Sequence, residues 1–190
     1  MNKIVLKNIN KSFDEKIVLR DLSAEFNHGE ISALMGKSGC GKSTLLNIIM
    51  GLLKADSGEI SGVPEKISAV FQEDRLCEEF SAYTNIRLSC PDKRKDEIIP
   101  TLRLLGLGDS IDKRVSTLSG GMKRRVAIIR AILSDWDLLI MDEPFKGLDE
   151  NTRLDVINFV REKTEGKTVI MVTHDEEDIK DIKGRKIDLW

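Results

Sequence analysis

The chain has 190 residues, of which 41% are hydrophobic and 33% charged, so one domain with a sizeable core under a solvated surface is expected. Its formal net charge of −2 excludes the global basic field of a protein that attracts nucleic acid through its overall charge. Three cysteines without a CxxC spacing favour reduced thiols in a cytosolic protein over a disulfide framework or a zinc site.

Extended runs and turns alternate in the N-terminal third. Residues 3–9 and 19–26 are extended runs, and residues 30–36 are an apolar run that enters a glycine-rich loop. Beyond the loop, residues 42–53 have the apolar spacing of a helix, which we expect to end near Gly51. Residues 66–72 then predict a further strand, which ends on a polar glutamine.

The pattern becomes helical between residues 74 and 133, where β-branched runs are few and prolines and glycines break the chain. We expect residues 74–133 to form a helical signature subdomain inserted into a core of residues 1–73 and 134–190. In its last helix one face is apolar at i, i+4, i+7 and i+11, which predicts burial. The residues of this face are Met122, Val126, Ile129 and Leu133.

Two continuous apolar runs follow, DLLIMDEP from Asp137 and TVIMVTH from Thr168, and both end in polar residues. Apolar strands that alternate with helices indicate a parallel sheet covered on both faces. Ligands of such sheets bind beyond the carboxyl ends of the strands. That edge is where Gly36, Gln72, Asp142 and His174 are expected.

The glycine-rich loop GKSGCGKST matches the whole G-x-x-x-x-G-K-[ST] pattern, between a predicted strand and a predicted helix. Its glycines let backbone N–H groups turn toward phosphate oxygens, and the helix N-terminus adds favourable dipole charge. Lys42 is predicted to reach the β- and γ-phosphates, Ser43 to ligate Mg²⁺ and Thr44 to contact the α-phosphate. An incidental flexible loop is the alternative. The predicted binding residues are Gly36, Lys37, Ser38, Gly39, Cys40, Gly41, Lys42, Ser43 and Thr44.

Two carboxylates, Asp142 and Glu143, follow the next apolar strand. Asp142 suits Mg²⁺ through a bound water, because Mg²⁺ keeps much of its hydration shell. Glu143 is placed to orient and polarise an attacking water, and phosphoryl transfer needs positioning and charge neutralisation more than covalent chemistry. A polar strand end before a proline turn is the alternative. After a complete phosphate loop, the pair predicts nucleotide hydrolysis.

Five further motifs, together with the loop and the carboxylates, resemble the nucleotide-binding subunit of an ATP-binding cassette (ABC) transporter from about Asn2 to Ile187. LSGGM resembles the family's signature loop, which is usually LSGGQ, so Met122 departs from the pattern. The other matches are Gln72 with the Q-loop glutamine, Gly147 to Asp149 with the D-loop, His174 with the switch histidine, and Phe13 with an aromatic that stacks on adenine.

The resemblance implies an α/β P-loop NTPase fold with a RecA-type parallel sheet core, an N-terminal antiparallel β subdomain and the helical insertion. It implies Mg²⁺-dependent ATP hydrolysis that powers transport through separate membrane permease subunits. The chain would then be cytoplasmic, at the inner face of the cell membrane. The catalytic residues would be Lys42, Gln72, Glu143 and His174, and the Mg²⁺ ligands Ser43, Gln72 and Asp142.

The family resemblance also implies that the signature loop acts on a partner. Ser119, Gly120 and Gly121 would cap the γ-phosphate of an ATP held by the phosphate loop of a second ABC subunit, so that a homodimer encloses two ATP molecules. Ser119 can cap the helix that follows, and the glycines open its N-terminus to an anion.

Less specific residues keep a structural alternative. His174 could be a hydrogen-bonded structural histidine, and Phe13 a core residue. Asp149 could serve as an N-cap as well as a D-loop residue. Lys123 to Arg125 favour a solvated helix face over nucleic-acid binding, because no aromatic residues interleave with them.

Two other function classes compete with a transport ATPase. A soluble ABC ATPase of cluster assembly, DNA repair or translation shares the motifs. A small GTPase or nucleoside kinase shares only the phosphate loop, and the chain lacks an NKxD motif. The stretches FQEDRL and EPFKGLDENTR resemble importer ATPases for nitrate, sulfonates and taurine, whereas CEEFSAYTNI departs from them. The transported substrate is not specified by this chain.

Overall fold

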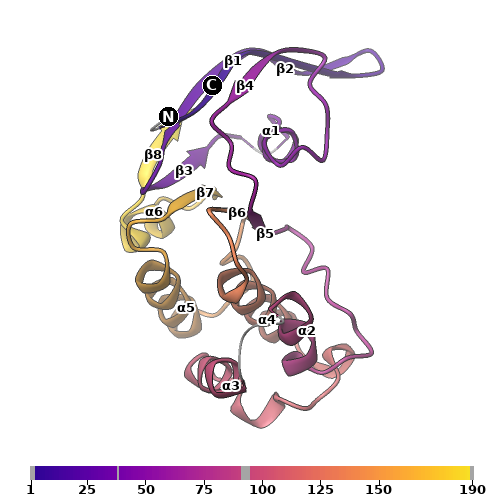
Figure 1. Ribbon diagram of the computed structural model, residues 1–190, viewed down its shortest axis with the longest axis vertical. Helices are drawn as coiled ribbons and strands as arrows, with labels where there is room; N and C mark the ends of the chain where they lie inside the picture. The colour runs from indigo at the N-terminus through magenta and orange to yellow at the C-terminus, as the bar shows by residue number, and fades with distance from the viewer. Residues whose placement is uncertain (1–2, 38, 91–94, 189–190) are drawn as a thin grey trace.

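The computed structural model describes residues 3–37, 39–90 and 95–188 (Figure 1). Within these ranges the strands form two sheets, an antiparallel one in the order β2-β1-β4 and a parallel one in the order β5-β6-β7-β3-β8. The strands are β1 (Lys3–Phe13), β2 (Lys16–Asn27), β3 (Ile31–Met35), β4 (Ser57–Ser61), β5 (Ile67–Val70), β6 (Leu138–Asp142), β7 (Thr168–Val172) and β8 (Arg185–Asp188).

Helices cover both faces of the parallel sheet (Figure 1). One helix packs between the two sheets, and the others lie on the opposite side of the parallel sheet or continue away from it. None of the described helices is long and apolar enough to cross a membrane. The helices are α1 (Lys42–Ile49), α2 (Ala82–Ser89), α3 (Lys95–Leu104), α4 (Gly120–Leu133), α5 (Glu150–Lys163) and α6 (Glu176–Ile182), with 3₁₀ turns at Gly108–Ser110 and Val115–Thr117.

Strands β6 and β7 form the centre of the molecule, and all ten of their residues are buried. Because successive side chains of a strand point to opposite faces, the two strands supply both cores. Leu138 and Ile140 pack with α1 and the antiparallel sheet. Leu139 and Met141 pack with the helices on the other face. A continuous apolar run is therefore what this position requires.

Helix α4 shows the burial predicted for its apolar face. Val126 and Ile129 are fully buried, and Met122 and Leu133 pack against the same core. Asp149 accepts a hydrogen bond from the Thr152 amide at the start of α5, so its predicted N-cap is confirmed.

The predicted fold class is confirmed: a parallel sheet core carries an antiparallel N-terminal sheet and a helical region. Strands β4 and β8 were not predicted. Both lie at sheet edges with mostly exposed residues, so neither has an apolar pattern. Helix α1 ends at Ile49, earlier than the predicted end near Gly51, where the chain adopts a φ of +70°.

Candidate active site

The strands β3, β5, β6 and β7 end at one edge of the parallel sheet, and a cavity of about 760 Å³ lies beside that edge. The phosphate loop, Phe13, Gln72 and the carboxylate pair, which are far apart in the sequence, meet around it, whereas His174 lines a smaller neighbouring cavity beside Glu143. Gly36 directly follows β3, and Ser38 lies outside the described residues. The predicted site residues that line the cavity are Phe13, Gly39, Gly41, Lys42, Ser43, Thr44, Gln72, Asp142 and Glu143.

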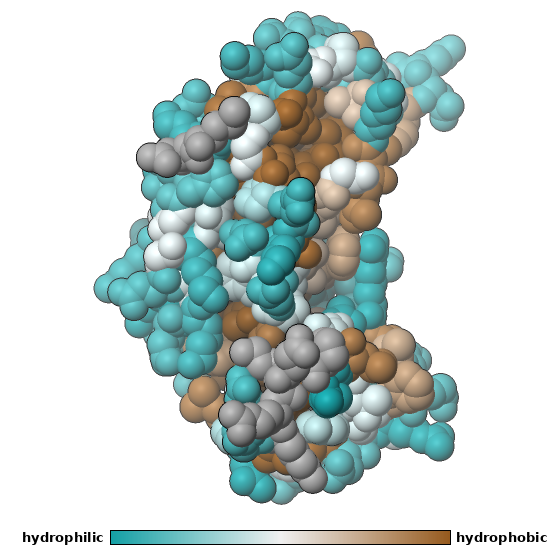
Figure 2. All heavy atoms as spheres, in the orientation of Figure 1, coloured by the Kyte–Doolittle hydropathy of each residue, from teal (hydrophilic) through white to brown (hydrophobic). Residues whose placement is uncertain are grey.

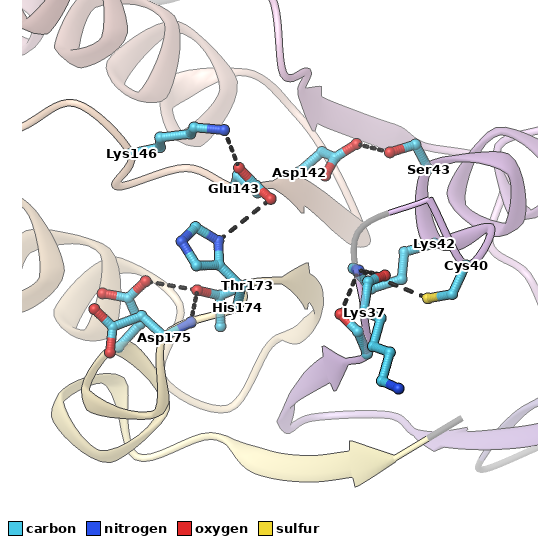
Figure 3. Close-up of polar contacts among 12 residues, drawn as sticks. Lys37, Cys40, Lys42, Ser43, Asp142, Glu143, Lys146, Thr173, His174 and Asp175 are labelled. Carbon is cyan, nitrogen blue, oxygen red and sulfur yellow. Dashed lines mark hydrogen bonds and ion pairs between the residues drawn. The ribbon is translucent and has the colours of Figure 1, made fainter. Parts of the chain in front are cut away.

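The phosphate loop wraps around its own lysine. Lys42 is buried, and its Nζ donates hydrogen bonds to the carbonyls of Gly36 (2.7 Å) and Lys37 (2.9 Å) (Figure 3). Cys40 Sγ lies 3.8 Å from the same Nζ. Gly41 precedes α1 with a φ of +101°, and a Cβ there would lie 2.7 Å from Leu19 Cδ2, so the turn into the helix requires glycine.

Ser43 and Asp142 form a pair of oxygen ligands. The Ser43 hydroxyl, in the first turn of α1, donates a 2.6 Å hydrogen bond to Asp142 Oδ2 at the end of β6 (Figure 3). Burial raises the pKa of Asp142 above its usual range, and the bond from Ser43 only partly offsets this rise. A hydroxyl and a carboxylate held together are hard oxygen donors, which suit Mg²⁺. The residues present therefore fit the predicted ion.

Glu143 is held by its backbone and by both carboxylate oxygens. Its φ is +46°, a conformation that non-glycine residues adopt rarely, and its amide donates to the Val172 carbonyl (2.9 Å). His174 Nδ1 lies 3.3 Å from Oε1, and Lys146 Nζ lies 2.9 Å from Oε2 (Figure 3). Burial raises the pKa of Glu143, but Lys146 and His174 outweigh it and leave the pKa below its usual value. The carboxylate is therefore kept ionised.

The loop that carries His174 is fixed by its neighbours. The Thr173 hydroxyl donates to Asp178 (2.7 Å) and accepts from the Asp175 amide (3.1 Å) (Figure 3). Arg153 Nε, on α5, donates to the other oxygen of Asp178 (2.8 Å). The histidine side chain itself is 64% exposed. His174 is thus exposed to solvent beside Glu143, and its loop is fixed by the hydrogen bonds of Thr173 and Asp178.

Helix α4, which follows the signature loop, binds the loop after β5 through Arg124. This contact contradicts the prediction that Lys123 to Arg125 form a solvated helix face. Arg124 is buried, and its guanidinium donates to the carbonyls of Phe71 (2.7 Å) and Gln72 and pairs with Asp74 (3.1 Å). Arg125 is partly buried and donates to the Leu105 carbonyl (2.7 Å). The predicted solvated helix face is therefore wrong for both arginines, because unpaired backbone carbonyls of neighbouring loops attract them.

The signature residues Ser119, Gly120 and Gly121 do not line this cavity. Ser119 is the N-cap of α4 and accepts a hydrogen bond from the Met122 amide (3.3 Å), as predicted. Gly120 and Gly121 form the first turn of that helix. Among the described residues, those that line the phosphate-loop cavity include none from this turn. The structure thus does not bring the two glycine loops of one chain together.

Phe13 ends β1 at the rim of the cavity. Phe13 is 45% exposed, so the alternative of a core residue is wrong. Lys11 Nζ lies 5.4 Å from the ring centroid, within cation–π range. An exposed ring beside a phosphate loop is available for stacking on a flat ligand, and its role in binding adenine stays a prediction.

The parallel sheet and the phosphate loop at its carboxyl edge define a nucleotide-binding protein of the P-loop class. The sequence model of the family described as "ABC transporter" matches residues 19–146, which is more than half of the chain. The chain belongs to the ABC transporter family, and it carries the family's ATP-binding ATPase domain.

Several curated proteins are similar to the chain. The aliphatic sulfonates import ATP-binding protein of Albidiferax ferrireducens is 33% identical over 97% of this chain and 69% of that protein. The taurine import ATP-binding protein of Roseobacter denitrificans is 38% identical, over 87% and 67%. A sulfate/thiosulfate import ATP-binding protein of Agrobacterium fabrum is 35% identical, over 97% and 60%. The chain thus spans about 60% to 70% of the length of these relatives.

Solved structures agree with the fold. A dimeric structure of a bacterial ABC transporter cassette has a TM-score of 0.86 and 30% identity, over 98% of this chain and 94% of that one. A bacterial Atm1-family ABC exporter with ATP bound has a TM-score of 0.88 at 23% identity and covers all of this chain and 37% of the exporter, which shows a shared fold.

Two residues at the site were not assigned a role from the sequence, Arg124 and Lys146. A signal for Arg124 was present, since the helix beyond it is apolar almost all round, which indicates a helix buried on several faces. A charged residue near the start of such a helix, like Arg124, must then contact other protein groups and not solvent. Lys146 lies in a tight turn after Glu143 that hydrophobic periodicity cannot show.

Proposed function

We propose that this chain binds Mg²⁺-ATP at the cavity beside the parallel sheet and hydrolyses it to drive import through separate membrane permease subunits. One observation carries the proposal: Lys42, the Ser43–Asp142 pair and Glu143 surround a single cavity at the carboxyl edge of the sheet. The names of the relatives, which are ATP-binding proteins of import systems for sulfonates, taurine, sulfate or spermidine and putrescine, support the direction of transport.

Each residue has a distinct role in this proposal. Bound Mg²⁺ would neutralise phosphate charge, with Ser43, Asp142 and Gln72 as its nearest protein groups. Lys42 and the backbone N–H groups of the loop hold the phosphates. Glu143, an ionised carboxylate, accepts a proton from the attacking water, and His174 beside it contacts the γ-phosphate and helps to hold that water. Phe13 stacks on the adenine ring.

We place the signature loop in a second copy of the chain. Ser119 already uses its hydroxyl to cap α4, and the amides of Gly120 and Gly121 at the helix N-terminus suit an anion. Since these residues do not line the cavity of their own chain, a head-to-tail homodimer would let each copy complete the other's site. The similarity to a dimeric cassette structure supports this arrangement.

An apolar groove on the surface supports the proposal that a permease is a partner of this chain. A groove of about 420 Å³ lies between the parallel sheet and α4, next to the loop that carries Gln72. Leu52 and Phe71 line it, and Leu52 is 61% exposed. Figure 2 shows the molecule hollowed on its right-hand side, with apolar atoms gathered along that side. We place the permease contact at this groove, which would keep the chain on the inner face of the membrane.

The variant Glu143→Gln tests the dimer and the catalytic role together. Glutamine keeps the shape of the side chain but removes the charge that polarises water, so ATP should bind and be hydrolysed at least about 100-fold more slowly. Size-exclusion chromatography with light scattering, with and without ATP, should show a monomer that becomes a dimer only with ATP.

Lys42→Ala is the matched control, because it should lose ATP binding and stay monomeric. If Glu143→Gln hydrolyses ATP at the wild-type rate, the proposed general base is wrong. If it binds ATP and remains monomeric, the proposed trans role of the signature loop is wrong. Recovery of the wild-type chain from membranes with soluble or ribosomal proteins, and no permease, would contradict the transport role.

A further inference from the structure

Lys146 reaches the proposed general base from the turn that follows it. The Lys146 amide donates to the Glu143 carbonyl (3.3 Å), which closes a turn and brings the lysine back over the glutamate. Its Nζ then lies 2.9 Å from Glu143 Oε2. His174 Nδ1 approaches the other oxygen, Oε1, at 3.3 Å. Figure 3 shows that the Lys146 and His174 side chains reach the carboxylate from different segments, so its two oxygens have different neighbours.

The two oxygens also differ in access. Oε2 has almost no solvent exposure and accepts no well-aligned hydrogen bond, so the ammonium of Lys146 is what compensates its charge. A buried carboxylate oxygen without such a partner would be costly. An attacking water cannot reach Oε2 in this arrangement. Oε1, which lies beside the exposed His174, is the oxygen left for it.

Other charged groups in this corner are engaged elsewhere. Asp142 accepts from Ser43, and Arg153 is paired with Asp178 and Asp181. Arg153, Asp175 and Asp178 line the same small cavity as Glu143 and Lys146, but no hydrogen bond or ion pair from these three to the Glu143 carboxylate is found in the described part of the chain. Lys146 therefore has no obvious substitute.

We propose that Lys146 is a positioning residue for hydrolysis: it anchors Oε2 of Glu143 so that Oε1 is aimed at the attacking water and His174. The proposal rests on the role of Glu143 as general base. The backbone of Glu143 is fixed by its bond to the Val172 carbonyl, and Lys146 fixes the far end of the same side chain. A general base that is fixed at both ends is already oriented before the reaction, so it loses little conformational freedom on reaching the transition state.

The variant Lys146→Met tests the proposal, since methionine keeps most of the length and removes the charge. Lys146 is 56% exposed, so the protein should fold. We expect kcat for ATP to fall roughly tenfold, with KM within about twofold, because the contact orients the base without binding substrate. Lys146→Arg should restore most of kcat. Lys7→Met, the same change at an exposed position of β1, should leave kcat unchanged.

A double variant with Glu143→Gln separates positioning from a general loss of structure. Once the carboxylate is gone, Lys146→Met should cause no further loss of kcat. Wild-type kcat in Lys146→Met overturns the proposal, and so does Lys146→Arg as slow as Lys146→Met.

The ¹³C carboxyl resonance of Glu143, assigned through Glu143→Gln, gives a readout that needs no ATP. It should move and broaden in Lys146→Met and return in Lys146→Arg. An unchanged resonance overturns the proposed anchor. If the wild-type chain hydrolyses no ATP, the proposed function fails, and this resonance still decides whether Lys146 orders the carboxylate.

Discussion

Arg124 joins the signature helix to the loop that carries Gln72, and its removal should cost much of the protein's stability. The variant Arg124→Met keeps an apolar stem of similar length but loses two charge-assisted hydrogen bonds to the Phe71 and Gln72 carbonyls. Such bonds contribute about 1.5 kcal/mol or more each. The partly buried Asp74 also loses its partner, and burial already raises the pKa of this carboxyl.

Breaking a buried ion pair from one side typically costs about 3–5 kcal/mol, and the two bonds alone give about 3 kcal/mol, so we expect a loss of about 4 kcal/mol. With a urea m-value of about 2.5 kcal/mol/M, the unfolding midpoint should fall by about 1.6 M. Replacing Asp74 by leucine in the same chain should recover part of the loss, because no orphaned carboxylate then remains.

The adjacent variant Lys123→Met is the matched control in the same helical turn. Lys123 pairs with Glu78, whose side chain is 63% exposed, so the pair should contribute less than about 1 kcal/mol. The reasoning is refuted if Arg124→Met unfolds within about 1 kcal/mol of the wild type, or at the same urea concentration as Lys123→Met. In either case the link between α4 and the Gln72 loop would be dispensable for the fold.

Two further predictions concern a helix cap and a cysteine. Ser81 caps α2 by accepting a 3.1 Å bond from the Thr84 amide, so Ser81→Ala should lower the free energy of unfolding by about 1 kcal/mol; a urea midpoint equal to that of the wild type would show that the cap is unimportant. A bulky maleimide adduct on Cys40 should block ATP binding, ATP should slow its formation, and Cys40→Ser should be insensitive. Complete modification of Cys40 by mass spectrometry with unchanged ATP affinity would contradict this.

The sequence predicts the central strands and the phosphate loop well, because both are local patterns. Strands β6 and β7 must be apolar on both faces, and the loop needs its glycines in a fixed order. The edge strands β4 and β8 carry no such pattern, since pairing with a neighbour and not burial places them.

The sequence likewise predicts one part of the candidate site and not the other. The sequence predicts which residues gather at the sheet edge, because the carboxyl ends of parallel strands meet there. It does not show the contacts of Arg124 and Lys146, which depend on where backbone carbonyls and a buried carboxylate oxygen lie in space. Long flexible cations find such partners only once the fold has formed, so even where the sequence indicates that a charge is buried, as for Arg124, it does not show which groups that charge contacts.

The separation of the two glycine loops within one chain has a consequence for mixtures of variants. Ser119 caps α4, Gly120 and Gly121 begin it, and the cavity is lined by the other loop. In the proposed head-to-tail homodimer, a faulty signature loop would therefore disable the site of the other copy, whose own phosphate loop is intact. A Ser119 variant and a Lys42 variant, each inactive alone, should therefore form mixed pairs in which both defects fall on one site. The other site would then contain only wild-type residues. Mixing the two inactive variants should therefore restore part of the ATPase activity.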